Sequence, residues 1–143
     1  MKKYLGYLYM LIFFMLFFLS LYNQNLSTIS LFSELGETYT TALITSQTYR
    51  PNSYDFTFTY GVETVRSSST GIGKWATFED RVNIGERVYI VFPKGMPEKA
   101  EIFLDFDVPS NLPEPPPGGW TLQELQQLDP HFKPGEPSTW FWP

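Results

Sequence analysis

The chain of 143 residues has no cysteine and only one histidine, His131. The lack of cysteine excludes disulfides and a lipid-modified N-terminal cysteine. A zinc site needs three or four convergent ligands, and one histidine with a few scattered carboxylates does not supply them. The serines have no nearby histidine to activate them as nucleophiles. We therefore expect no catalytic residues, no metal site, no cofactor and no enzymatic activity.

Basic residues are also scarce. Lysine and arginine total 10 against 15 aspartate and glutamate, so the net charge is −5 and the isoelectric point is near 4.8. Nucleic-acid binding depends on clustered lysine and arginine, which this composition does not provide. The same shortage argues against a polybasic surface for anionic lipids. We expect no nucleic-acid partner.

Charge is absent altogether from Tyr4–Tyr22, a run rich in leucine and phenylalanine. As a helix this run would be about 28 Å long, close to the hydrocarbon thickness of a bilayer. Residues 1–22 therefore predict a transmembrane anchor with a single span. Lys2 and Lys3 precede the run, so the positive-inside rule places the N-terminus in the cytoplasm and the rest in the periplasm or outside the cell. A cleaved signal peptide is the alternative, but the apolar run is long for one and no A-x-A-like site follows.

Residues 23–36 are interpreted as a connector that can extend the helix or pack on the following domain. From Glu37 to Asp107 the pattern changes to period two with many β-branched residues, most clearly in Tyr54–Tyr60. Five strands are expected, over Tyr39–Thr48, Tyr54–Tyr60, Glu63–Ser69, Arg87–Phe92 and Ala100–Phe106. The predicted fold is mainly β, a small antiparallel sheet curled into a sandwich or partial barrel.

Residues 108–143 form a C-terminal extension rich in proline and tryptophan. Five of the twelve residues in Val108–Gly119 are proline, which favours a stiff polyproline II conformation. Thr121 and Glu124 have the spacing of a capping box, so a two-turn helix is expected over Leu122–Leu128.

The segment Ile84–Ile102 reads IGERVYIVFPKGMPEKAEI. It resembles the end of the bacterial DUF3592 family, with Gly85-Glu86 as the turn, Val88–Phe92 as the strand, and Pro93 with Pro97 in the loop. The resemblance covers about Glu37–Leu104. It implies a small β domain tethered to a membrane, and it implies no activity.

The large aromatic side chains of the extension need cover from water. They can pack back on the β domain, dock on a partner protein or lie at a membrane interface, and the sequence leaves these alternatives open. The preferred function is a noncatalytic, membrane-anchored accessory or scaffolding protein of a bacterial envelope or membrane complex. It would dock a protein partner through the apolar residues of the extension, namely Trp120, Leu122, Leu125, Trp140, Phe141 and Trp142.

A second hypothesis is a β domain that binds a small ligand or lipid without enzymatic activity. The aromatic face of one strand would then line an interior cavity, through Tyr54, Phe56, Phe58 and Tyr60.

Overall fold

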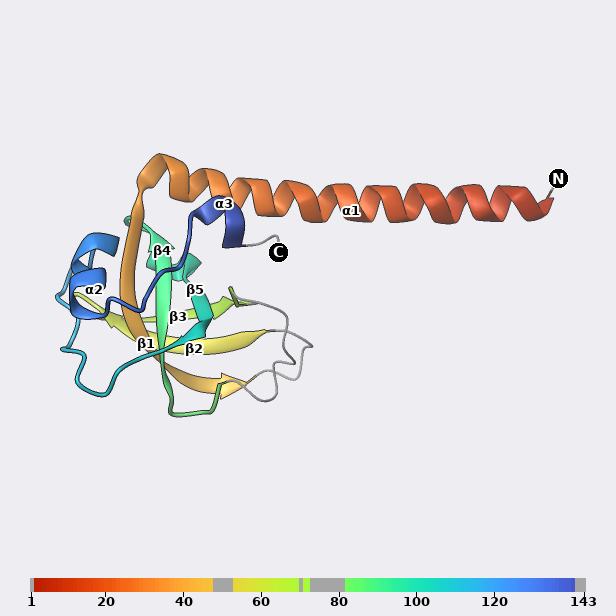
Figure 1. Cartoon of the computed structure of the whole chain (residues 1–143). Coiled ribbons are helices and arrows are strands. Elements are labelled where there is room, and N and C mark those ends of the chain that lie inside the picture. The colour runs from red at the N-terminus through yellow and green to blue at the C-terminus, as the bar shows by residue number, and fades with distance from the viewer. Residues whose placement is uncertain (1, 48–52, 70, 73–81, 141–143) are drawn as a thin grey trace.

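The computed structural model describes residues 2–47, 53–69, 71–72 and 82–140, and Figure 1 shows their arrangement. The fold is mainly β, with five antiparallel strands and three α-helices among the described residues. The expected strands lie within two residues of the observed ones. In chain order the elements are α1 (Lys2–Leu35), β1 (Glu37–Gln47), β2 (Tyr54–Tyr60), β3 (Glu63–Ser69), β4 (Arg87–Pro93), the 3-10 helix η2 (Pro97–Lys99), β5 (Glu101–Asp107), α2 (Leu122–Leu128) and α3 (Pro137–Trp140).

The sheet has the order β3-β2-β1-β4-β5. Strand β1 is central and pairs with β4 over Glu37–Leu43, whereas β2 pairs with β1 only from Leu43 onward. The other strands therefore leave one edge of the first half of β1 unpaired. That edge becomes important for the C-terminal extension.

The two outer strands, β3 and β5, approach each other. The Ser67 hydroxyl donates to the carbonyl oxygens of Glu98 and Ala100, at 3.0 and 3.2 Å. Just beyond β3, Ile72 forms a parallel bridge with Phe103 on β5. These contacts join the ends of the curled sheet, which is therefore a partial barrel.

Strand β4 is buried on both faces, and its alternation divides the core in two. An inner cluster includes Val88, Ile90 and Phe92, together with residues of β1, β2 and β5. An outer cluster includes Tyr89 and Val91, and it is completed by residues of α1 and the C-terminal extension. A strand with one face in each cluster needs apolar residues at every position, which explains the run VYIVF.

Helix α1 is one continuous helix, and its N-terminal part projects away from the partial barrel in Figure 1. It ends at Gly36, whose positive φ of 79° is the left-handed conformation that glycine adopts at low cost. The Gly36 N–H donates to the Phe32 carbonyl at 3.0 Å, and Phe32 itself is buried in the outer cluster. Residues 23–35 thus belong to the same helix as the uncharged run, and the last turns of that helix are fixed to the β domain.

Among the residues that the structure describes, no helix is both long enough and apolar enough to cross a membrane. This finding contradicts the predicted transmembrane anchor over residues 1–22. The single-pass topology, the membrane as a partner and the membrane localisation with an exported domain depended on that anchor, so they are corrected with it. The uncharged run does not form an element of its own, because it is the first part of a longer helix that ends on the β domain.

Helix α2 begins as the sequence predicts. Thr121 Oγ1 accepts from the Glu124 N–H at 3.3 Å, and the Glu124 carboxylate accepts from the Thr121 N–H at 2.7 Å. The Glu124 carboxylate also accepts from the Thr121 hydroxyl at 2.9 Å, and the hydrogen bonds from the Thr121 N–H and then from this hydroxyl lower the pKa of the Glu124 carboxyl. The capping box therefore fixes the point at which the extension turns from its proline-rich segment into helix.

Candidate functional site

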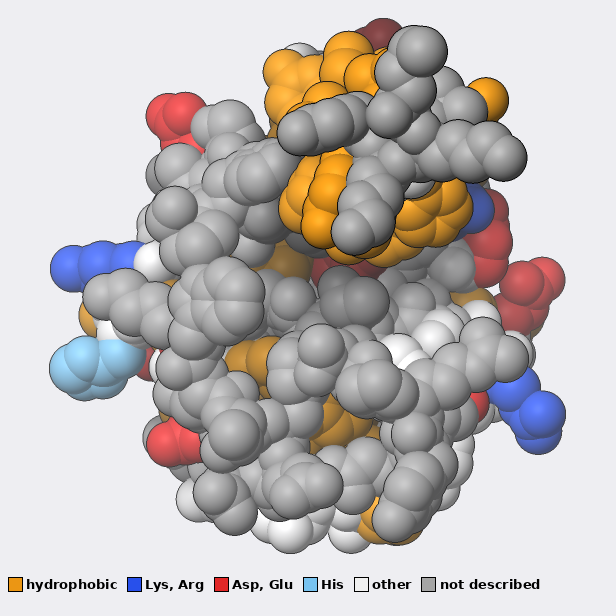
Figure 2. Space-filling view, turned by 90° about the vertical axis from the view of Figure 1, so that its right-hand side faces the viewer, with side chains coloured by type: hydrophobic (Ala, Val, Ile, Leu, Met, Phe, Trp, Pro, Cys, Tyr) orange, Lys and Arg blue, Asp and Glu red, His pale blue; other side chains and the backbone are white. Residues whose placement is uncertain are grey.

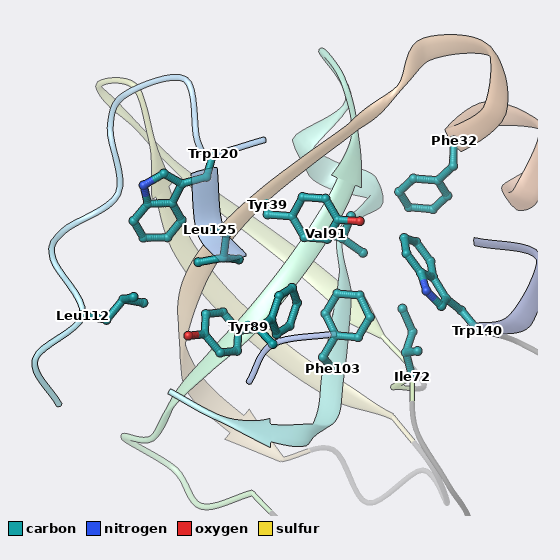
Figure 3. Packing of buried hydrophobic residues seen from close by; sticks show 11 residues of the cluster. Phe32, Tyr39, Ile72, Tyr89, Val91, Phe103, Leu112, Trp120, Leu125 and Trp140 are labelled. Atoms are coloured by element: carbon teal, nitrogen blue, oxygen red, sulfur yellow. The ribbon is translucent and has the colours of Figure 1, made fainter. Parts of the chain in front are cut away.

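The C-terminal extension covers the outer face of the sheet, and Figure 3 shows its side chains within the outer cluster. Trp120 and Leu125 lie toward one end of this cluster, and Trp140 lies toward the other beside Phe32. Both tryptophans are only 6% exposed, and Leu125 is fully buried. Their side chains are thus covered by the protein itself.

Trp120 is fixed by backbone pairing with the unpaired edge of β1. The Tyr39 N–H donates to the Trp120 carbonyl at 2.9 Å, and the Trp120 N–H donates to the Tyr39 carbonyl at 2.7 Å. The preceding residue, Gly119, has a φ of +70°, and a Cβ there would lie 2.5 Å from Thr38 Cγ2 and 2.8 Å from the Tyr39 carbonyl oxygen. Only glycine fits this close approach without displacing the extension.

Phe132 is at the centre of the outer cluster. Its ring contacts those of Tyr89 at 4.4 Å, Phe106 at 4.9 Å and Phe103 at 5.3 Å between centroids. The contacts with Phe103 and Phe106 are edge-on and the contact with Tyr89 is tilted, and such ring pairs stabilise the core beyond the burial of apolar area. Phe132 is one of the aromatic residues of the extension that the sequence marked as needing cover, although it was not among the named partner contacts.

A buried hydrogen bond also holds the extension. The Tyr89 hydroxyl donates to Asp129 Oδ2 at 2.9 Å, and the His131 N–H donates to Asp129 Oδ1 at 3.0 Å. Burial, followed by the hydrogen bond to Asp129, raises the pKa of Tyr89. The tyrosine therefore remains a neutral donor, and the buried carboxylate has a donor for each oxygen.

Trp140 links α1 to the β domain. Its ring meets Phe32 of α1 at 5.2 Å and Phe103 of β5 at 5.3 Å, both edge-on. Its indole N–H donates to the Pro134 carbonyl at 2.9 Å, which satisfies the polar atom of a buried ring. Figure 1 shows the result, with α3 packed beside the C-terminal part of α1.

Of the other predicted partner contacts, Leu122 is half-buried against the outer cluster. Phe141 and Trp142 lie outside the described residues. The structure thus brings Trp120, Leu122, Leu125 and Trp140 together, but it does so inside the fold. For Trp120 and Trp140, this burial favours packing on the β domain over docking on a partner protein or lying at a membrane interface.

The residues of the ligand-binding hypothesis are also brought together. Tyr54, Phe56 and Phe58 are buried in the inner cluster, with Tyr60 half-buried against it. Phe58 stacks on Phe56 and on Phe92, with ring centroids 6.0 and 5.7 Å apart. These rings pack against one another, and the ligand-binding role stays a prediction.

A polar network joins β3 to β5, and sequence reasoning missed it. The Ser69 hydroxyl accepts from the N–H groups of Gly71 and Ile102, at 2.9 and 3.1 Å, and donates to Glu101 Oε2. Burial raises the pKa of the Glu101 carboxyl from 4.5 to about 7, and the Ser69 hydrogen bond opposes that rise. No local motif marks this pair, because its members lie on strands distant in sequence.

Within the described ranges, no three histidine, cysteine or acidic residues lie close enough to hold a metal ion. In the part of the chain that the structure describes, the longest run of exposed apolar side chains is on α1. Every residue from Tyr7 to Leu19 is apolar and exposed, with exposed fractions of 44% to 68%. Figure 2 views this region from the end of the helix, where hydrophobic side chains gather at the top of the molecule.

Comparison of the chain with protein-family models, curated proteins and solved structures gave no match. The resemblance to the DUF3592 family is neither supported nor refuted by these comparisons.

Proposed function

We propose that the protein is a noncatalytic accessory or scaffolding protein, in which the β domain holds α1 as an arm that a protein partner surrounds. The arm is defined here as Tyr7–Leu19. The observation that carries the proposal is the continuous apolar exposure of these thirteen residues. Monomeric soluble proteins rarely leave an apolar surface of this extent open to water.

The shape of the surface indicates how the arm is covered. Successive residues of an α-helix are about 100° apart, so thirteen consecutive apolar residues cover every side of the helix. A flat surface on a partner would cover only one side. A helix that is apolar all round needs neighbours all round, so the partner supplies several apolar elements, such as helices packed along the arm.

The rest of the molecule supports a scaffolding role for the arm. Its base is fixed by Phe32, which is buried in the outer cluster and contacts Trp140. Of the aromatic residues proposed from the sequence as partner contacts, Trp140 attaches α1 to the β domain, since its ring contacts both Phe32 and Phe103. A partner bound to the arm would therefore be held in a fixed orientation relative to the partial barrel.

The test compares the native chain with a double variant, Leu11→Gln with Phe18→Gln. These residues are 66% and 64% exposed, so their replacement should leave the folding of the β domain unchanged. Each chain is purified from its native source in mild detergent, and bound proteins are quantified by native mass spectrometry. The proposal expects a stoichiometric partner on the native chain and at least about tenfold less on the variant.

The matched control is Val62→Gln, since Val62 is 101% exposed but lies in the turn between β2 and β3. This variant should keep the partner. The proposal would be overturned if the native chain were recovered without any bound protein, so that only detergent or added phosphatidylcholine vesicles covered the arm.

A further inference from the structure

The proline-rich segment Leu112–Pro116 lies between two tight turns and belongs to no helix or strand. The first turn is closed by the Leu112 N–H, which donates to the Pro109 carbonyl at 3.0 Å. The second is closed by the Gly119 N–H, which donates to the Pro116 carbonyl at 2.8 Å. The segment between the turns is therefore a short bridge with defined ends.

The local sequence, LPEPPP, restricts the backbone of this bridge. Each proline fixes its own φ near −65°, and the residue before a proline is pushed out of the α region into extended conformations. From Leu112 to Pro116, every residue is a proline, precedes one, or both. The bridge therefore has the restrictions of a polyproline II helix, which has three residues per turn.

Burial along the bridge follows the same period of three. Leu112 is buried and Pro115, three residues later, is half-buried, so this edge rests on the protein. The other two edges face solvent, one formed by Pro113 with Pro116 and the other by Glu114 with Pro117, the first residue after the bridge. One edge of the polyproline helix thus packs against the rest of the protein, and the other two edges are exposed to solvent.

Three anchors hold the bridge in place. Leu112 packs in the outer cluster, the Pro117 carbonyl accepts from the Gly61 N–H at 2.9 Å, and Trp120 pairs with Tyr39. A bound partner would therefore spend little free energy on ordering this segment, since folding has already ordered it.

We propose that this ridge, defined as Pro113, Glu114, Pro116 and Pro117, is a docking site for a protein domain that reads polyproline II helices in an aromatic-lined groove. Such grooves grip two adjacent edges of a preformed polyproline helix, and the ridge presents two. The domain should carry a basic side chain beside the groove. Glu114 favours this, because its side chain is 90% exposed and its contact with Arg87, at 3.9 Å, leaves most of the carboxylate open to solvent.

This inference does not depend on the proposed function, because the ridge and the arm lie on different elements. A chain with both surfaces would bring a partner held on α1 close to a second protein held on the ridge. A negative binding result for the ridge would not contradict the proposed role of the arm, and a negative result for the arm would not contradict the role of the ridge.

The test titrates the purified full-length chain, in mild detergent, with a panel of SH3 and WW domains, the probes for polyproline recognition. Binding is measured by calorimetry for the native chain and for the double variant Pro113→Ala with Pro116→Ala. The matched control is Pro130→Ala, because Pro130 is also exposed but lies outside the ridge. Thermal melting of all three chains establishes that each is folded.

The inference expects saturable binding of at least one domain to the native chain and to the Pro130 variant, and at least about tenfold weaker binding to the double variant. Glu114→Gln should weaken the same complex about threefold at low salt and have less effect at high salt, since an exposed charge pair is screened. Failure of every domain in the panel to bind the native chain would overturn the inference, as would equal binding by the native chain and the folded double variant.

Discussion

Tyr39 and Trp120 exchange both of their backbone hydrogen bonds, although they are 81 positions apart in the sequence. The pairing is possible because β2 joins β1 only from Leu43 onward, which leaves the edge of β1 at Tyr39 open. The C-terminal extension occupies that edge and then crosses the outer face of the sheet. This relationship makes the extension part of the fold, and it leads to the following predictions.

Replacement of Gly119 by alanine should destabilise the protein. The added Cβ would lie 2.8 Å from the Tyr39 carbonyl oxygen, at a backbone with a φ of +70° that alanine adopts only with strain. We expect the free energy of unfolding to fall by about 2 kcal/mol or more, measured by urea denaturation with tryptophan fluorescence. Gly118→Ala is the control, since a Cβ at Gly118 meets nothing within 4 Å. Equal stability of the two variants would argue against the pairing of Trp120 with Tyr39.

Replacement of Phe132 by alanine should remove the centre of the outer cluster. Phe132 is fully buried and its ring contacts those of Tyr39, Tyr89, Phe103 and Phe106. Truncation of a buried phenylalanine costs about 3–5 kcal/mol, and calorimetric melting would measure the loss. Leu128→Ala, at a residue 46% exposed, should change stability by less than about 1 kcal/mol. A Phe132 variant as stable as the native chain would mean that the extension does not pack on the domain.

The stability of the protein should fall as the pH rises from about 4.5 to about 7, through the contribution of Glu101. Burial raises the pKa of this carboxyl to about 7 in the folded state, so over this range the folded protein holds a proton that the unfolded chain releases. The free energy of unfolding then decreases with pH and levels off above the folded pKa. A rise from 4.5 to about 7 corresponds to about 3 kcal/mol at most.

Glu101→Gln should remove this part of the pH dependence, as measured by urea denaturation at several pH values. Glu114→Gln is the control, because the Glu114 side chain is 90% exposed. A native-like pH profile in the Glu101 variant would assign the dependence to another group.

Much of the fold could be predicted because its signals are local. The alternation in Tyr54–Tyr60 matches β2 residue for residue, and the spacing of Thr121 and Glu124 marks the start of α2. The order of the strands and the partial closure of the barrel through Ile72 and Phe103 depend on contacts between distant segments, which periodicity does not report.

The candidate sites were less predictable. The sequence singled out Trp120, Leu125 and Trp140 as large apolar residues in need of cover, and it left open whether the cover is the domain or a partner. The structure buries them in the outer cluster. It also places the exposed apolar surface on α1, where the sequence had predicted a membrane span that the described helices do not support.

The sequence by itself determined the strands, the capped helix α2 and the stiff proline-rich bridge, because hydrophobic period, capping groups and the proline ring act over a few residues. Only the tertiary structure decided what those elements cover. Strand β4 is apolar on both faces, so the sheet needs a second layer, and the extension supplies it through Trp120, Phe132 and Trp140. Which segment covers the outer face of the sheet depends on how apolar surfaces from distant parts of the chain fit together. Among the described residues, the arm on α1 stays exposed.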